Sequence, residues 1–282
     1  MKTLKYLLPV LFIFILFISC NSDDEEVKKV DETENLTLVK QFTNDTHIIE
    51  VYTESGMFKT GYNDISLRIK NKADNSYIND LTISWMPMMA MTTMNHSCPK
   101  SNIKKVEGTE FMYNGYLVFQ MTGVDNSGWS IKFMYNINGT DYMVEEGISV
   151  FNNTRQRVAT FMGSDGVKYI LAMVNPNKPE IAINQMSVTL HKMESMMMFP
   201  VVENFTITLD PRMPSMNNHS STNNTDLAYN ATTKMYDGNL SLTMTGYWRL
   251  NLKLLNENND ILKGEDLSDS ISESTLYLEI EF

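Results

Sequence analysis

The chain has 282 residues, which is enough for two domains of ordinary size. Its 34 acidic and 23 basic residues give a formal net charge of −11. An acidic protein is a poor partner for nucleic acid and a reasonable one for cations, so the charge argues against a nucleic-acid-binding function.

Residues 1–19 predict a secretory signal. Two lysines precede a nearly unbroken apolar run over residues 7–18, which is too short to span a bilayer comfortably. The small residue Ser19 stands before Cys20, and this arrangement resembles a bacterial lipoprotein signal with Cys20 as the lipidated residue. An ordinary signal peptide with an incidental cysteine is the alternative.

Residues 20–40 are polar and acidic, and they predict a flexible tether between a membrane anchor and the first domain. The run Asn-Ser-Asp-Asp-Glu-Glu directly after Cys20 resembles the surface-export signal of Bacteroidetes lipoproteins; a solvated tether is the plainer interpretation. We therefore expect an outer-membrane lipoprotein of the bacterial cell envelope, which the export signal would place on the cell surface. If Cys20 carries lipid, Cys98 is the one remaining thiol and no intrachain disulfide can form.

Two stretches of similar length predict β-structure. Residues 41–150 contain about seven short strand patterns, such as the period-two alternation of residues 65–70, separated by turn residues. The same kind of pattern begins again at residue 168 and continues to residue 282. We expect an all-β protein with two antiparallel, immunoglobulin-like β-sandwich domains in tandem, over residues 41–150 and 168–282.

A recurring set of residues supports a tandem repeat. Each copy contains Met-Pro-x-Met, then a histidine, then Met-Thr-Gly and a tryptophan. The spacing between copies stays near 120 residues, which is the length of a whole domain. The corresponding pairs are Met86 and Met213, His96 and His219, Met121 and Met244, and Trp129 and Trp248.

Residues 85–98 hold five methionines, one histidine and one cysteine. Thioether sulfur is a soft donor that suits Cu(I) and binds Ca²⁺ or Mg²⁺ poorly, and histidine serves either oxidation state of copper. Pro87 removes a backbone donor, so the strand around it lies at an edge or leaves the sheet. The sequence therefore predicts a soft-metal site, with Cys98 as one further ligand candidate and Met196–Met198 able to face either cluster.

Methionine also fills cores and contacts aromatic rings, and the chain has 22 methionines beside 26 phenylalanines and tyrosines. We expect five methionines, two histidines and two tryptophans to be structural. They are Met57, Met112, Met134, Met143, Met173, His47, His191, Trp129 and Trp248.

The string Trp-Met-Pro-Met-Met-x-Met-x-x-Met-x-His-x-Cys-Pro, in a β-sandwich of this size behind a lipoprotein signal, resembles the YtkA-like/FixH-like domains. These are small extracytoplasmic immunoglobulin-like modules often found with copper-export or cytochrome-oxidase assembly components. Residues 81–99 match closely, the rest of residues 45–150 match in pattern only, and residues 168–282 lack the extra methionines and the Cys-Pro. The resemblance implies these metal-site residues: Met86, Met88, Met91, Met94 and His96, with Met213, Met216 and His219 as counterparts.

The sequence has no Gly-x-Ser-x-Gly, His-Glu-x-x-His, phosphate-binding loop or Cys-x-x-Cys, so we do not expect an enzyme. The leading hypothesis is an anchored envelope lipoprotein that binds Cu(I) for buffering or delivery, with copper-transport or oxidase-assembly proteins as partners. The alternative is a surface lipoprotein of two immunoglobulin-like modules that binds a protein or glycan and whose methionines are structural.

Overall fold

The computed structural model describes residues 31–123 and 128–282. The expected signal, Cys20 and most of the expected tether lie outside these residues. Residues Glu32–Phe282 form one compact unit. No helix within the described part of the chain is long and apolar enough to cross a membrane.

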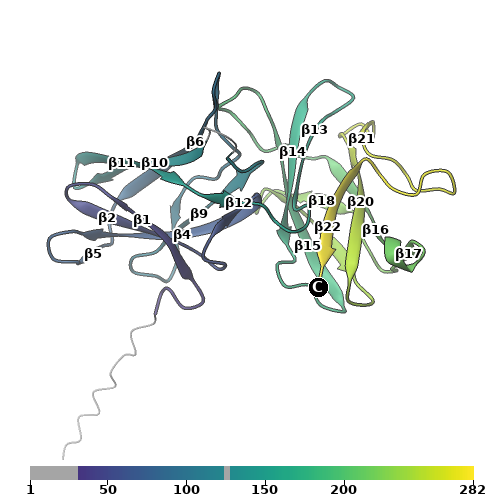
Figure 1. The fold of residues 1–282 in the computed structure, drawn as a ribbon, viewed down its shortest axis with the longest axis horizontal. Helices are drawn as coiled ribbons and strands as arrows, with labels where there is room; N and C mark the ends of the chain where they lie inside the picture. The colour runs from purple at the N-terminus through teal and green to yellow at the C-terminus, as the bar shows by residue number, and fades with distance from the viewer. Residues whose placement is uncertain (1–30, 124–127) are drawn as a thin grey trace, which may run out of the picture. The chain divides into compact units, whose positions relative to one another are not determined.

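The N-terminal half consists of strands β1–β12 and contains two main antiparallel sheets (Figure 1). The six-stranded sheet is formed by β1 (Thr37–Thr43), β2 (His47–Thr53), β4 (Gly61–Asn71), β9 (Tyr113–Phe119) and β8 (Lys104–Lys105), with β5 (Tyr77–Ile78) beside β4. The four-stranded sheet is formed by β11 (Thr140–Ile148), β10 (Gly128–Ile137), β6 (Thr82–Ala90) and β7 (Asn95–His96). A short parallel pair joins β3 (Phe58–Lys59) to β12 (Val150–Phe151).

The two main sheets of the N-terminal half enclose one apolar core. Alternate residues of each strand point into it, as the period-two pattern predicts. Phe42 of β1 and Phe133 of β10 meet edge to face with ring centroids 5.0 Å apart. Trp85 and Trp129 are buried in the same cluster. This half is therefore a β-sandwich.

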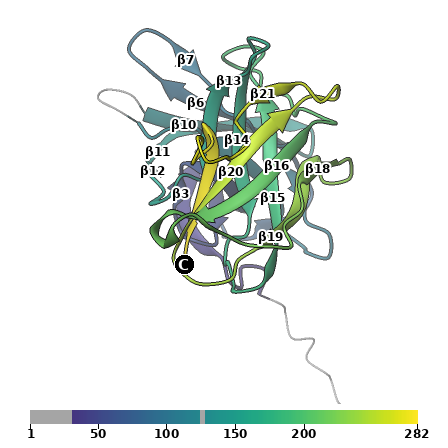
Figure 2. The same cartoon turned by 90° about the vertical axis from the view of Figure 1, so that its right-hand side faces the viewer.

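The C-terminal half consists of β13–β22, which all belong to one ten-stranded sheet. Its main path runs through β13 (Val158–Met162), β14 (Lys168–Asn175), β15 (Ile183–Lys192), β19 (Met235–Ser241), β18 (Leu227–Asn230), β16 (Thr206–Met213), β20 (Tyr247–Leu255) and β21 (Ile261–Lys263). The strand β17 (His219–Ser220) pairs with β16, and β22 (Leu276–Glu281) pairs with β20. Figure 2 shows β16 and β20 side by side.

This ten-stranded sheet nearly closes on itself. The Glu279 amide of β22 donates a hydrogen bond of 2.9 Å to the carbonyl oxygen of Gln156, just before the first strand β13. The sheet curls around a core that includes Trp248, Tyr236 and Met213. The expected all-β, antiparallel architecture is confirmed. The C-terminal half, however, carries its strands in one continuous barrel-like sheet, whereas the N-terminal half divides its strands between two main sheets and a short parallel pair.

Candidate metal centre

The methionine-rich stretch forms the β6–β7 hairpin. Ala90 pairs with Asn95 and Met89 pairs with His96. The loop between the strands is four residues long, and it is closed by a hydrogen bond of 3.0 Å from the Met91 amide to the Met94 carbonyl oxygen. The hairpin lies at the edge of the four-stranded sheet, where Pro87 is tolerated because β7 is too short to pair with it.

Strand alternation divides the predicted ligands between two faces. Met89 points into the core and is fully buried, together with Trp85 and Pro87. Met86 and Met88 point to the opposite, outer face of β6 and are partly exposed. The Met86 sulfur lies 4.0 Å from the Lys100 ammonium group, which is an unfavourable neighbour for a second cation. The structure therefore does not bring Met86 or Met88 together with His96.

His96 is the histidine of the hairpin, and its ring lies at the margin of the core. Its Nδ1 atom is 2.9 Å from the Ser97 carbonyl oxygen, and because a carbonyl only accepts, Nδ1 carries the proton. In the neutral ring the Nε2 atom then has a free lone pair, and no described residue hydrogen-bonds to it. The ring stands perpendicular to Trp129, with centroids 5.4 Å apart. An imidazole oriented by a backbone carbonyl through its other nitrogen is the usual state of a metal-binding histidine.

Cys98 lies two residues beyond His96 and is only 1% exposed, within the core of the sandwich. Burial raises the pKa of its thiol, so the group is protonated at neutral pH. The thiolate is the form that binds metals. The buried thiol of Cys98 therefore lacks the form in which cysteine binds a metal.

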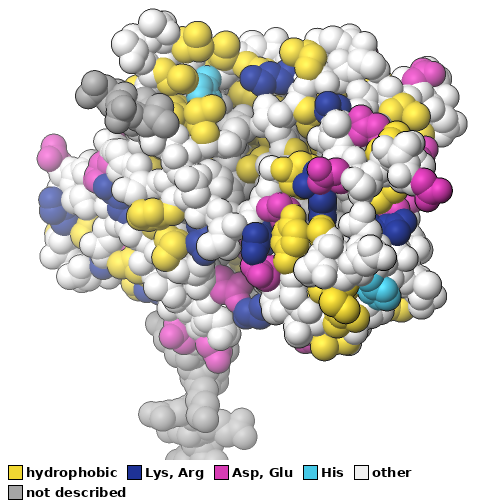
Figure 3. Space-filling model, turned by 45° about the vertical axis from the view of Figure 1, so that its right-hand side comes forward, with side chains coloured by type: hydrophobic (Ala, Val, Ile, Leu, Met, Phe, Trp, Pro, Cys, Tyr) yellow, Lys and Arg dark blue, Asp and Glu magenta, His cyan; other side chains and the backbone are white. Residues whose placement is uncertain are grey.

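Thioethers at the tip of the hairpin remain available. Met94 is 48% exposed, and Met91 is partly buried against the core. A second group joins them from the C-terminal half, because the Ser97 amide donates a hydrogen bond of 2.8 Å to the Met196 carbonyl oxygen. The Met196–Met198 stretch thus lies beside the first cluster. In Figure 3, histidine side chains reach the surface beside hydrophobic side chains at two separate places.

The C-terminal half repeats part of this arrangement. Met213 of β16 pairs across strands with His219 of β17, and the His219 and Trp248 ring centroids are 6.3 Å apart. Met213 is buried, whereas His219 and Met216 are exposed. The Nε2 atom of His219 lies 3.5 Å from the Thr243 hydroxyl. The second copy therefore exposes one imidazole and one thioether.

The methionine that corresponds to Met213 in the structure lies three residues after the one that corresponds to it in the sequence repeat. Met89 lies beside both His96 and Trp129 in the sheet register, and Met213 holds the matching position beside His219. The sequence comparison paired Met86, not Met89, with Met213. The strand register supplies this correction, because the same Met-Pro dipeptide falls at different distances from the two strand ends.

Some structural assignments are confirmed and others are wrong. His47, His191, Trp129, Trp248, Met112 and Met173 are all buried, as expected. Three methionines expected in the core are exposed instead. They are Met57, Met134 and Met143. Met134 and Met143 face each other across β10 and β11 on the outer side of the sheet, where alternation places them, and the sequence pattern did not show which face was buried.

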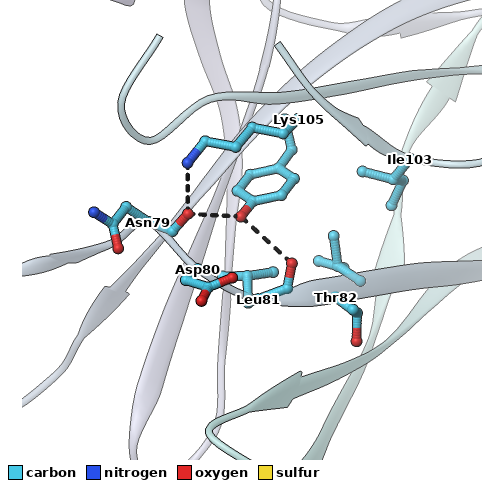
Figure 4. A pocket seen from close by; sticks show the side chains of 8 residues that line it. Asn79, Asp80, Leu81, Thr82, Ile103 and Lys105 are labelled. Atoms are coloured by element: carbon cyan, nitrogen blue, oxygen red, sulfur yellow. Dashed lines mark hydrogen bonds between the residues drawn. The ribbon is translucent and has the colours of Figure 1, made fainter. Parts of the chain in front are cut away.

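A separate pocket of about 580 Å³ lies near β5 and the start of β6 (Figure 4). No methionine or histidine lines it. The Lys105 ammonium and the Tyr113 hydroxyl both donate to the Asn79 carbonyl oxygen, at 2.6 and 3.1 Å, so its strongest donors are occupied. Among the described residues, no group of three or more His, Cys, Asp or Glu side chains could hold a metal ion.

Comparison with models of protein families gives no match, and comparison with curated proteins gives no similar sequence.

Proposed function

We propose that the protein binds a soft metal ion, Cu(I), at the tip of the β6–β7 hairpin. The observation that carries this proposal is the state of His96. Its Nδ1–H donates to the Ser97 carbonyl oxygen, so the Nε2 lone pair is free at the margin of the core. Exposed Met94 and half-buried Met91 stand on the same hairpin and supply thioether sulfur.

One imidazole and two thioethers form a neutral, soft donor set. Such a set favours Cu(I) over hard cations such as Ca²⁺ and Mg²⁺. Met94 is exposed on the short loop before His96, so an incoming ligand can reach the metal from the loop side and displace the protein ligands in turn. Copper buffering or delivery by ligand exchange is the function that this chemistry suits.

The remaining parts of the proposal rest on the sequence. The chain is a copper-binding lipoprotein of the cell envelope, anchored in the outer membrane through Cys20, with copper-transport or oxidase-assembly proteins as partners. Its two halves are immunoglobulin-like modules in tandem, similar to YtkA-like/FixH-like domains. The repeated pairing of a buried methionine, a histidine and a tryptophan supports this relation between the halves.

The second copy is the weaker site in this proposal. His219 and Met216 are exposed, but Met213 is 3% exposed and belongs to the core. Two open donors hold Cu(I) less tightly than three. We therefore expect a second equivalent of Cu(I) to bind more weakly than the first.

An anaerobic Cu(I) titration against a chromogenic chelator tests the proposal. We expect the full chain to take one equivalent from the chelator. His96→Ala, or Met91→Leu with Met94→Leu, should weaken this uptake by about tenfold or more, since even an altered outer-shell partner costs a metal site that much. Met134→Leu with Met143→Leu changes two exposed methionines of the outer sheet face and serves as the matched control.

The titration also decides the alternative function, binding of a protein or glycan with purely structural methionines. In that case the wild-type chain takes no copper from the chelator, and Cu(I) leaves its melting temperature unchanged. Either of these results in the wild-type chain would remove the copper proposal.

A further inference from the structure

Three consecutive methionines occupy a tight turn after β15. The Glu194 amide donates to the Met198 carbonyl oxygen at 3.0 Å, and the Met197 amide donates to the Ser195 hydroxyl at 3.2 Å. Met196, Met197 and Met198 are 43%, 38% and 58% exposed. None of the three belongs to a hydrophobic core cluster of the described residues. Core filling, the common role of methionine, therefore does not account for this triplet.

A main-chain hydrogen bond links the turn to the β6–β7 hairpin next to His96. The hydrogen bond of 2.8 Å from the Ser97 amide to the Met196 carbonyl oxygen joins residues 99 positions apart. Ser97 is fully buried, and its hydroxyl donates to the Pro87 carbonyl oxygen at 2.7 Å. A main-chain hydrogen bond of this kind holds two segments about 5 Å apart, as in paired strands. A methionine side chain has three rotatable bonds and can span such a distance.

The imidazole that is free to bind a metal belongs to His96, which directly precedes Ser97 in the hairpin. His96 presents its Nε2 lone pair, while Ser97 is the residue that carries the contact to the turn. Two thioethers on the hairpin and one imidazole leave room for further soft ligands around Cu(I). The exposed sulfur atoms of the triplet belong to a segment that a main-chain hydrogen bond holds against the hairpin at Ser97.

We propose that the Met196–Met198 triplet supplies thioether ligands to the metal bound at His96, so that one Cu(I) ion is held jointly by the N-terminal and C-terminal halves of the chain. This inference rests on the function proposed above and adds a ligand set to the same site. It makes the contact between the halves part of the metal site. Metal binding should therefore stabilise that contact, since a ligand stabilises the state to which it binds.

The test uses the full chain with Met196→Leu, Met197→Leu and Met198→Leu combined. Leucine keeps the volume and apolar character of methionine but has no sulfur. The matched control replaces three exposed methionines elsewhere: Met134→Leu, Met143→Leu and Met162→Leu. Competition with a Cu(I) chelator measures affinity, and X-ray absorption at the copper edge measures the number of sulfur neighbours.

We expect the triplet variant to bind Cu(I) about tenfold more weakly or worse, with fewer sulfur neighbours, and the control to match the wild type. Equal affinity and equal sulfur count in the triplet variant would overturn the shared site but leave binding at His96 intact. Failure of the wild-type chain to take up Cu(I) would instead remove the proposed function itself. Circular dichroism and metal-free melting of each variant verify that the fold is unchanged.

Discussion

The most heavily bonded carboxylate in the described chain is that of Glu50 on β2, and it lies on the sheet face turned away from the core. It accepts hydrogen bonds from Lys70 at 2.7 Å, Arg68 at 2.8 Å, and the hydroxyls of Tyr52 and Tyr77 at 2.7 and 3.0 Å. Burial by itself raises the pKa of Glu50, but these four donors outweigh it and lower the pKa to about 2.

This lowered pKa predicts the pH dependence of stability. Because the pKa of Glu50 is lower in the folded state than in the unfolded state, its contribution is complete above about pH 4.5 and is lost as the pH falls toward 2. The shift corresponds to roughly 3 kcal/mol of unfolding free energy. We expect Glu50→Gln to lose about this amount at pH 7, with the difference from wild type shrinking between pH 4.5 and 2.

Urea unfolding at several pH values measures this effect, with the exposed Glu107→Gln as the control. A Glu50→Gln variant as stable as the control at pH 7 would show that the network contributes nothing.

Cys98 gives a second prediction at the residue scale. Its thiol is buried and its pKa is raised by burial, so thiolate reagents should not reach it in the folded protein. With Cys20→Ser in place, Cys98 is the one thiol of the chain. We expect Ellman's reagent to react with it only after urea is added. Rapid reaction without urea would contradict the buried position and return Cys98 to the ligand set.

At the scale of elements, each half has a tryptophan whose indole hydrogen-bonds to the main chain of the connection that precedes its own strand. The Trp129 indole N–H donates to the Met121 carbonyl oxygen at 2.9 Å, and the Trp248 indole N–H donates to the Met244 carbonyl oxygen at 3.0 Å. Both rings are fully enclosed by their cores. This correspondence gives a structural role to the Met-Thr-Gly and tryptophan residues that recur in the sequence.

Replacing each tryptophan by phenylalanine removes the hydrogen bond and part of the ring volume. We expect Trp129→Phe and Trp248→Phe each to lower the unfolding free energy by about 1–3 kcal/mol. Phe151→Leu, at an exposed strand end, is the control and should change little. Denaturant unfolding followed by circular dichroism measures all three. A loss in only one of the two tryptophan variants would weaken the claim that the loops are equivalent.

The strands themselves could be predicted from the sequence, but their register could not. Period-two alternation identifies β4 and β6 directly, because one face of each is buried. The position of each histidine depends on the connection that precedes it. A four-residue loop leads to His96, whereas the short 3-10 helix Pro214–Met216 leads toward His219. These connections differ in length, so the matching Met-Pro dipeptides do not occupy matching sites.

The Met196–Met198 triplet shows a second limit of sequence reasoning. Its composition indicated a soft-donor group, but its place beside His96 depends on one backbone hydrogen bond between residues far apart in the chain. No local pattern encodes such a contact. Met134 and Met143 illustrate the same limit, because only the packing of the two sheets decides which face of β10 and β11 is exposed.

At the scale of the whole described unit, one strand joins the two halves. Strand β14 is buried on both faces: Leu171 and Met173 belong to the C-terminal core, while Ile170 and Ala172 pack with Val118 of β9. A strand buried on both faces reads as a continuous apolar run, which is how residues 169–174 appear in the sequence. The contact between the halves is therefore apolar at its centre and includes the fully buried Ala172.

Ala172→Asp tests whether this contact holds the two halves together. A carboxylate introduced there has no cationic partner in the same apolar cluster, and an uncompensated buried charge costs about 3–5 kcal/mol. The protein can avoid that cost by separating the halves while each keeps its own core. We therefore expect calorimetry to show two transitions in place of one. Thr160→Asp, on the exposed face of the neighbouring strand β13, is the control and should retain a single transition. If Ala172→Asp also unfolds in one transition at the wild-type temperature, the halves do not depend on this contact.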